Sequence, residues 1–477
     1  MTVFDFGRRF GRLCAVTAVL VALSAPLYAQ TEQDYQRLEG EVKELRALLE
    51  QLQSAQAAAE AKVKELEKAE APAAAPQDAM AQFKELERRL ELIAAELENI
   101  QLGNAAVEES ATLDQARYGL GIAASKVYRV DQGLSIGGYG EAVYENFDDR
   151  REDGSDSGKT DQFDFLRAIF YFGYKFNDNW VLNTEIEIEH ADEIFLEFAT
   201  IDYLHKPMLN FRAGMLLMPV GLLNELHEPT LFHSAERPRV ESAIIPSTWR
   251  ENGLGIFGEN ERFSYRSYLV NGLDGSGFSS SGLRGGRQKG SRAKAESIGW
   301  VGRFDYIGTP GLLVGGSLYI GDSGQGIEDA GGQEIGAETT VFEFHLDYKY
   351  RGFSFRTLYA QAEVDDVARL NEALGYTGNA SIGEELDGFY VEAGYDVFVD
   401  RDDRGALTPF LRYETLDTQA AVPVGFSRNP SKDADILTFG LAWQPIDQLV
   451  FKLDYQDWSD GADTGIDQWN FAIGYLF

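Results

Sequence analysis

The sequence predicts an all-β protein: a 16-stranded antiparallel transmembrane β-barrel preceded by an α-helical coiled coil. Three observations predict this fold class. Apolar and polar residues alternate along most of the chain after residue 131, a heptad pattern occupies residues 30–101, and the last alternating segment ends on the aromatic Phe477. The 477 residues include 49 glycines, 22 tyrosines and 30 phenylalanines, which suits tight turns and aromatic belts at a membrane surface.

Residues 1–29 are predicted to be a removable signal peptide. Arg8, Arg9 and Arg12 precede the apolar stretch 13–25, and small residues follow just before position 30. The only cysteine, Cys14, lies in this segment, so the exported chain would carry no thiol. Export combined with a transmembrane barrel predicts the bacterial outer membrane as the location.

Residues 30–101 are predicted to form a periplasmic coiled coil. Leu38, Val42, Leu45 and Leu49 follow alternating steps of four and three, and the same steps resume at 83–100 after a break rich in proline and alanine. Such an apolar stripe must pack against another helix, but the pattern does not identify that helix. Self-association into a parallel bundle and a single helical hairpin both remain open. Residues 102–130 are mixed and punctuated by glycine, and they are interpreted as a linker.

Residues 131–477 form the predicted barrel domain. The alternating segments in it are even in number, which would place both ends of the barrel in one compartment. They span residues 134–146, 163–176, 180–189, 193–205, 209–217, 252–257, 263–271, 297–306, 312–320, 339–349, 353–363, 387–398, 406–416, 436–444, 448–458 and 466–477.

The connections alternate between short turns and longer loops. Short turns such as Phe176–Trp180 and Tyr350–Gly352 are each followed by a connection that is usually longer. Outer-membrane barrels place the short turns in the periplasm and the long loops outside. A large secreted β-sandwich or propeller also has many strands, but it does not explain this rhythm.

The alternation predicts which side chains point into the barrel. A cation facing lipid near the midplane costs about 2–4 kcal/mol, so the basic residues within strands belong in the lumen. An aqueous lumen lined with cations attracts anions. Because many carboxylates also point inward, a wall network of ion pairs is the competing interpretation. The predicted pore-lining basic residues are Arg167, Arg212, Arg266, Arg303, Arg356, Arg412 and Lys452, and the inward acids are Glu185, Glu187, Glu189, Glu343, Asp347, Glu414 and Asp454.

The connection 218–250 is too long and too apolar for an ordinary turn. We expect it to fold into the barrel and narrow the pore, burying Leu222, Leu226, Phe232 and Ile244. The charged and imidazole side chains of this constriction loop would then face the solute path. They are Glu225, His227, Glu228, Arg237, Arg239 and Glu241.

A second connection, within 282–294, is locally basic in an acidic chain. It is rich in glycine and carries Arg284, Arg287, Lys289, Arg292 and Lys294. On the external side it would gather anions or bind the phosphates of lipopolysaccharide, although a solvated loop without a partner is an equal alternative.

Composition excludes several other functions. A formal charge of -34 repels nucleic acid unless a local basic patch intervenes. Only 5 histidines are present, and no nucleophile elbow or phosphate loop is found, so we expect no enzyme activity and no cofactor. A metal site of the zinc-protease type at His227, Glu228 and His233 is not expected, because the spacing is wrong and Pro229 breaks the helix.

Arg212-Ala-Gly-Met, Pro219-Val-Gly-Leu and Ser247-Thr-Trp-Arg-Glu-Asn-Gly-Leu-Gly, with the strands that follow, resemble the phosphate-selective porin O/P family over residues 130–477. That resemblance implies a trimeric pore whose inward basic residues guide anions. The leading coiled coil is similar to that of trimeric dicarboxylate porins. This sequence departs from the family in its many inward carboxylates.

Together these features predict a homotrimeric outer-membrane porin, a passive diffusion channel for small hydrophilic solutes with a preference for anions such as phosphate or carboxylates. Its expected partners are outer-membrane lipid, lipopolysaccharide and small anionic or polar solutes, with peptidoglycan as a further candidate through the coiled coil. The alternative is a structural outer-membrane anchor whose periplasmic coiled coil tethers the cell wall or partner proteins.

Overall fold

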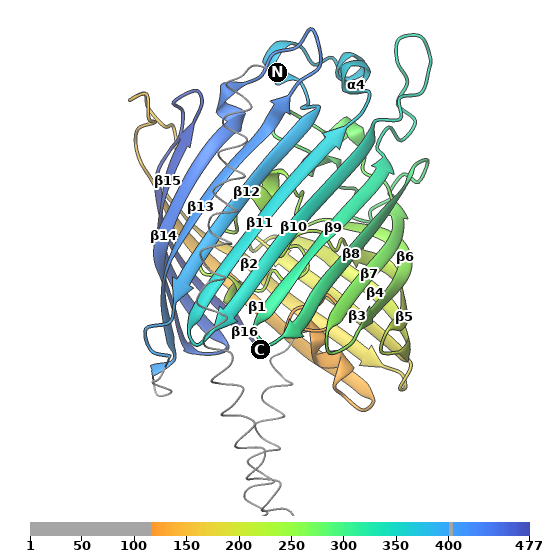
Figure 1. Ribbon diagram of the computed structural model, residues 1–477, viewed down its shortest axis with the longest axis vertical. Coiled ribbons are helices and arrows are strands. Elements are labelled where there is room, and N and C mark those ends of the chain that lie inside the picture. Colours follow the sequence, from red (N-terminus) through yellow and green to blue (C-terminus); the bar gives the residue numbers. More distant parts are fainter. Residues whose placement is uncertain (1–115, 400–403) are drawn as a thin grey trace, which may run out of the picture. The chain divides into compact units, whose positions relative to one another are not determined.

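The computed structural model describes residues 116–399 and 404–477. In this part of the chain the strands form one closed antiparallel barrel in which sequence neighbours pair and β1 pairs with β16 (Figure 1). The predicted 16-stranded barrel is therefore confirmed. The predicted signal peptide, the coiled coil and the first half of the predicted linker lie outside the described residues.

The strands run alternately up and down the wall. Their bounds are β1 (Gly133–Phe147), β2 (Gln162–Lys175), β3 (Trp180–Glu189), β4 (Glu193–Lys206), β5 (Leu209–Leu217), β6 (Arg250–Glu259), β7 (Phe263–Asn271), β8 (Ile298–Thr309), β9 (Leu312–Asp322), β10 (Glu338–Tyr350), β11 (Phe353–Val364), β12 (Glu385–Tyr395), β13 (Ala406–Ala421), β14 (Asp433–Ile446), β15 (Leu449–Asp460) and β16 (Gln468–Leu476).

Burial follows the alternation of the sequence. In β16, Trp469, Phe471 and Tyr475 point outward and are exposed, whereas Asn470 and Ala472 point inward and are buried. The same sorting along the other strands covers the outside of the barrel with large apolar side chains. A barrel in lipid requires an apolar exterior. It also requires a closed sheet, because closure leaves no backbone edge without a partner.

The last residue closes the barrel. The amide of Phe477 donates to the carbonyl of Gly138 at 2.8 Å, and the amide of Gly138 donates back at 3.0 Å. A side chain at position 138 would meet the Phe477 ring, since an added Cβ would lie 2.7 Å from it. Glycine at this position therefore lets the terminal aromatic pack directly on the first strand.

The connections differ at the two ends of the barrel. At the end where β16 terminates, most are short turns: 176–179, 207–208, 260–262, 310–311, 351–352 and 447–448. At the other end lie 148–161, 218–249, 272–297, 323–337, 365–384, 422–432 and 461–467, and the connection 365–384 carries α4 (Val367–Leu374). The predicted rhythm holds except that 190–192 is short and 396–405 is long.

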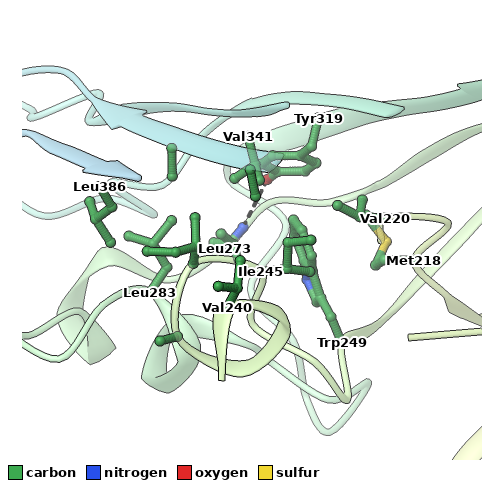
Figure 2. Packing of buried hydrophobic residues seen from close by; sticks show 14 of the residues in the cluster. Met218, Val220, Val240, Ile245, Trp249, Leu273, Leu283, Tyr319, Val341 and Leu386 are labelled. Carbon is green, nitrogen blue, oxygen red and sulfur yellow. Dashed lines mark hydrogen bonds between the residues drawn. The ribbon is translucent and has the colours of Figure 1, made fainter. Parts of the chain in front are cut away.

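The connection between β5 and β6, residues 218–249, turns into the barrel, and we call it the inserted loop. It carries the short elements η2 (Pro229–Leu231) and α3 (Val240–Ala243). Figure 2 shows its apolar residues Val240, Ile245 and Trp249 packed against Leu273 and Tyr319. The ring centroids of Trp249 and Tyr319 are 4.8 Å apart. Burial of these side chains explains why so apolar a connection does not stay in water.

The predicted linker 102–130 differs from the structure in its described part. Residues 116–130 include η1 (Ala124–Tyr128), which packs against β1, β2 and β3. Leu120, Ala123 and Val127 join a buried cluster with Tyr139 of the wall. Small apolar residues spaced for burial therefore keep this stretch on the barrel, where the sequence suggested only a mixed, glycine-punctuated link. Among the described residues, no helix is long and apolar enough to cross a membrane.

Candidate functional site

The inward basic residues of the strands are all buried and all paired. Each has a side-chain nitrogen within 4.0 Å of a carboxylate oxygen, as the competing interpretation of a wall network expected. They are Arg167 of β2, Arg212 of β5, Arg266 of β7, Arg303 of β8, Arg356 of β11, Arg412 of β13 and Lys452 of β15. A buried charge without a partner costs several kcal/mol, which explains the pairing.

Some of these pairs lie entirely within the wall. Arg212 makes two bonds of 2.9 Å to Asp202 on the neighbouring strand β4. Arg356 donates to Asp347 at 2.7 Å, and this pair sits directly opposite across β10 and β11. Cross-strand placement gives each guanidinium a carboxylate in the same layer, so the neighbour on the sheet neutralises the charge.

The same cations also hold the inserted loop. Arg266 reaches Glu225 of the loop at 2.8 Å and Asp305 of β8 at 3.2 Å. Arg303 is bound to Asp305 at 2.8 Å and donates to the carbonyl of Gly221. Glu225 therefore attaches the first part of the loop to β7 and β8.

The middle of the loop is attached on the opposite wall. Arg356 donates to the carbonyl of Leu231 at 3.0 Å, and Lys452 donates to the carbonyl of Ser234 at 3.0 Å. The Lys452 ammonium also lies 3.5 Å from the centroid of the Phe232 ring. Arg412 donates to the hydroxyl of Ser234. The loop thus runs across the interior from β7 and β8 to β13 and β15.

The predicted constriction-loop acids serve as attachments. Glu228 accepts bonds from the amides of Ile122 and Ala123, both at 2.9 Å. Glu241 accepts from the amide of Leu223 and from the hydroxyl of Tyr390, both at 2.7 Å. We expected Glu225, Glu228 and Glu241 to face the solute path. For Glu228 and Glu241 this was wrong: each is buried among donors, because a loop enclosed in the barrel needs acceptors for the backbone amides around it. Glu225 pairs with Arg266 and also lines a cavity, so its place beside the solute path stays a prediction.

The other side chains of the inserted loop that were predicted to face the solute path are His227, Arg237 and Arg239. His227 is buried, and burial lowers its pKa to about 4, so the ring is neutral at pH 7. Arg237 donates to the carbonyl of His227 at 3.4 Å. Arg239 is exposed at the end of the barrel that carries the long connections.

A basic pocket lies at that end. Its volume is about 370 Å³, and α3 of the inserted loop and the connection 272–297 line it together. Among the described residues, no carboxylate oxygen lies within 4.0 Å of the charged nitrogens that line it. These lining cations are Arg239, Arg284, Arg287 and Lys289, and the serines Ser242, Ser279 and Ser281 add hydroxyl donors.

Burial and, after it, repulsion between neighbouring guanidinium groups lower the pKa values of two cations in this pocket. Burial, followed by the charge of Arg237, lowers the pKa of Arg284 to about 10. Burial, followed by the charge of Arg284, lowers the pKa of Arg287 to about 9. Arg287 is held in place by its bond to the carbonyl of Thr248 at 2.8 Å. Cations gathered without counter-charges attract anions from solution.

The other basic residues predicted for this region lie elsewhere. Lys294 is bound to Asp274 at 2.9 Å, so its charge is balanced. Arg292 is exposed, and it does not line the pocket. Three of the predicted external basic residues, Arg284, Arg287 and Lys289, are therefore brought together with Arg239 of the inserted loop.

A larger cavity, about 910 Å³, lies at the end of the short turns. Glu225, Leu226, Arg266 and Arg303 line it, with residues of the turn 310–311. The inserted loop contributes to this cavity through Glu225 and Leu226 and to the basic pocket through Arg239 and Ser242. Different parts of the inserted loop therefore line these two hollows.

Several buried carboxylates that pair with arginines were not predicted from the sequence. Asp202, Asp305 and Glu392 sit at inward positions of their strands, so the alternation could have identified them as partners of the arginines. Glu197 gave no such signal. The pairing of β3 with β4 shifts register beside it, and both Glu197 and Phe198 are buried. A bulge of this kind breaks the period-two rule.

Comparison with known proteins finds a relative that is similar in sequence. No family model matches the chain. A protein of Aquifex aeolicus (strain VF5), described as uncharacterized, is 38% identical over 377 residues, which covers 75% of this chain and 83% of that protein.

Solved structures similar to the chain are outer-membrane barrels. Salmonella typhi OmpF in complex with daunomycin has a TM-score of 0.49 at 12% identity, covering 73% of this chain and 98% of that one. The channel DcaP of Acinetobacter baumannii has a TM-score of 0.47 at 10% identity, covering 72% and 97%. An anion-selective porin from Comamonas acidovorans has a TM-score of 0.45 at 12% identity, covering 72% and 100%.

Proposed function

The chain belongs to the same family as the Aquifex aeolicus protein, and we propose that it is an outer-membrane porin, a passive channel for small hydrophilic solutes. The observation that carries this proposal is the closed barrel with an apolar exterior and a charged interior hollowed at both ends. A wall of this kind isolates a polar interior from lipid, which is the physical requirement for a diffusion channel.

We further propose a preference for anions, and we assign it to the basic pocket. The inward cations of the strands are neutralised by carboxylates, so they add little net field. The pocket around Arg284 and Arg287 has cations without carboxylates in contact, and its serine hydroxyls supply donors for anionic oxygens. Phosphate and carboxylate solutes fit this chemistry, in line with the resemblance to phosphate-selective porins.

The inserted loop acts as the constriction in this proposal. Its contacts with strands on opposite walls support a fixed position inside the barrel. A loop anchored in this way would set the effective pore radius, and solutes would pass beside it between the two hollows.

The proposal includes the segments outside the described residues. We propose that 1–29 is removed on export and that 30–101 forms a periplasmic coiled coil that joins three chains. Lipid and lipopolysaccharide would then surround the trimer. Deleting 31–101 tests this part: loss of the trimer on a native gel supports assembly by the coil, and an unchanged trimer overturns it.

Single-channel recording tests the channel itself. The purified full-length protein is inserted into a planar bilayer, and its reversal potential is measured in a potassium chloride gradient. Stepwise conductance with chloride preferred supports the proposal. Preference for potassium overturns the anion assignment, and a folded barrel without conductance overturns the channel.

A structural anchor is the second candidate, and the many bonds between the inserted loop and the wall favour it, because they hold the loop across the interior of the barrel. In that case the barrel would conduct nothing, and its role would depend on the coiled coil and a partner such as peptidoglycan. Co-sedimentation of the exported chain with isolated peptidoglycan, with and without residues 31–101, measures this role.

A further inference from the structure

Inside the barrel, side chains from three elements meet at one point. Glu185 of β3, Glu197 of β4 and His227 of the inserted loop place their ligand-type atoms within 4.8 Å of one another. The exposed fractions of these residues are 0%, 0% and 2%. Two carboxylates and an imidazole are thus enclosed together, away from bulk water.

The hydrogen bonds of His227 fix its tautomer. Nδ1 lies 3.0 Å from the carbonyl oxygen of Asn224, and a carbonyl only accepts, so Nδ1 carries the hydrogen. In the tautomer with its hydrogen on Nδ1, Nε2 presents a lone pair. That lone pair faces Oε1 of Glu185 at 3.3 Å. An acceptor therefore faces an acceptor, which is stable only when a proton or a cation lies between them.

Two further oxygens of the cluster have no donor. Oε2 of Glu185 and Oε2 of Glu197 are buried, and neither has a hydrogen-bond partner. Arg250 reaches only Oε1 of Glu197, at 3.3 Å. Arg167 contacts Glu187 and Glu141 instead. Two buried carboxylate oxygens of the cluster therefore have no hydrogen-bond donor, and such orphaned oxygens point to a missing positive ligand.

We propose that Glu185, Glu197 and His227 bind a divalent first-row transition cation, with Zn²⁺ as the representative ion. A neutral imidazole nitrogen and carboxylate oxygens are the ligands that Zn²⁺ takes in proteins. Ca²⁺ and Mg²⁺ take oxygen ligands, so the histidine argues against them. The bond from Nδ1 to a backbone carbonyl is the usual orientation of a metal-binding histidine.

This site differs from the helical motif that the sequence spacing excluded. Glu228 is occupied by backbone amides, and His233 lies elsewhere, 3.7 Å from Glu392. The ligands here come from two wall strands and one loop, so no spacing rule along the chain could reveal them. A bound cation would link β3, β4 and the inserted loop, and so fix the loop at its centre.

A shared proton is the competing explanation. The carboxyl groups of Glu187 and Glu197 lie close enough to interact. A proton between them, with another on Glu185, would also remove the repulsion, and the cluster would then bind no metal. Metal stoichiometry separates the two explanations without any use of channel activity.

The test uses the full-length protein in detergent. It is stripped with a chelator, loaded with zinc chloride, dialysed against metal-free buffer and analysed by elemental mass spectrometry. We expect about one Zn²⁺ per chain, and a thermal midpoint that rises with zinc concentration but not with calcium. Glu185→Gln, Glu197→Gln and His227→Gln should each lower the affinity by more than the roughly 10- to 100-fold typical of losing an outer-shell partner.

His233→Gln is the matched control, because it makes the same substitution in the same loop outside the cluster. It should keep the full zinc content. Barrel folding of every variant is checked by the shift of the unboiled protein on a denaturing gel, so loss of metal is scored only in folded protein. A wild-type protein that retains no zinc, or a folded His227→Gln variant that retains as much as wild type, overturns the site.

Discussion

The cations inside the barrel and the cations of the basic pocket differ in their partners. Arg303, Arg356 and Arg412 lie deep in the wall, and each contacts a carboxylate and the inserted loop. Arg284 and Arg287 lie at the rim and contact neither a carboxylate nor an acidic loop residue within 4.0 Å among the described residues. The same residue type therefore has a structural role in one region and an electrostatic role in the other.

Solvent explains the difference. Deep in the barrel, an unpaired guanidinium would lose its hydration without compensation, so pairing is obligatory. At the rim, water still reaches the charges, and cations can remain unbalanced at a moderate cost. Attraction of solutes is therefore expected from the rim, whereas the interior cations determine the position of the loop.

Removal of an interior cation should have the largest effect. Arg412→Met removes the guanidinium group that pairs with Glu392 and Glu414, and it frees Ser234 of the loop. We expect a loss of about 3–5 kcal/mol in the free energy of unfolding. Urea titration of protein refolded into lipid vesicles measures it. The control is Arg239→Met at the rim, which should change stability by about 0.5 kcal/mol or less; equal losses in both variants would contradict the distinction.

The second-largest effect should be on how the stability of the protein depends on pH, through Glu236 of the inserted loop. Burial, followed by the charge of Glu145, raises the pKa of Glu236 to about 7. Because the folded-state pKa exceeds the unfolded value near 4.5, the stability linked to the protonated carboxyl is complete below pH 4.5 and is lost as pH rises through 7. Glu236→Gln should remove about 1–3 kcal/mol of this dependence. Identical stability curves between pH 5 and 8 for the variant and wild type would refute the prediction.

Charge reversal at the rim should alter selectivity and leave stability nearly unchanged. Arg284→Glu combined with Arg287→Glu replaces the pocket's cations by carboxylates. We expect the anion-to-cation permeability ratio to fall about three- to tenfold, since one unit charge at 4 Å in water is worth about 1 kcal/mol. Reversal potentials give the ratio. Arg262→Glu, exposed in a turn at the other end, is the charge-matched control; a similar fall there would remove the special role of the pocket.

A change in ionic strength should have the smallest effect, a weaker preference for anions. Raising the salt from about 0.1 M to about 1 M shortens the Debye length from about 10 Å to about 3 Å. Exposed rim cations are then screened, whereas buried pairs are not. We expect the anion preference to weaken about twofold across this range while the unfolding midpoint moves little. A preference that does not depend on salt would place its origin among the buried cations.

The wall of the barrel could be predicted from the sequence, and the attachment of the loop could not. Alternation determines which face each strand residue occupies, so Arg212 and Lys452 are identified as inward from local sequence alone. Their partners depend on contacts between residues far apart in the chain. Lys452 meets the Phe232 ring and the Ser234 carbonyl, and Glu228 meets the amides at 122 and 123.

The basic pocket, too, could be predicted only in part from the sequence. The basic character of 282–294 was visible in the sequence, but the contribution of Arg239 from another loop was not. The bulge at Glu197 also hid a buried carboxylate from the period-two pattern. Local patterns report the face of an element, whereas a site built from several elements depends on how the closed barrel brings them together.

The attachment points of the inserted loop have a consequence for assembly. The loop leaves β5 at Leu217 and returns at β6 with Arg250, and these two residues pair with each other in the sheet. The inserted loop is therefore hinged at one place on the rim, and no segment has to thread through a closed barrel. The barrel can close first and the inserted loop can fold in afterwards, so insertion into the membrane and narrowing of the passage are separable events in the biogenesis of this barrel.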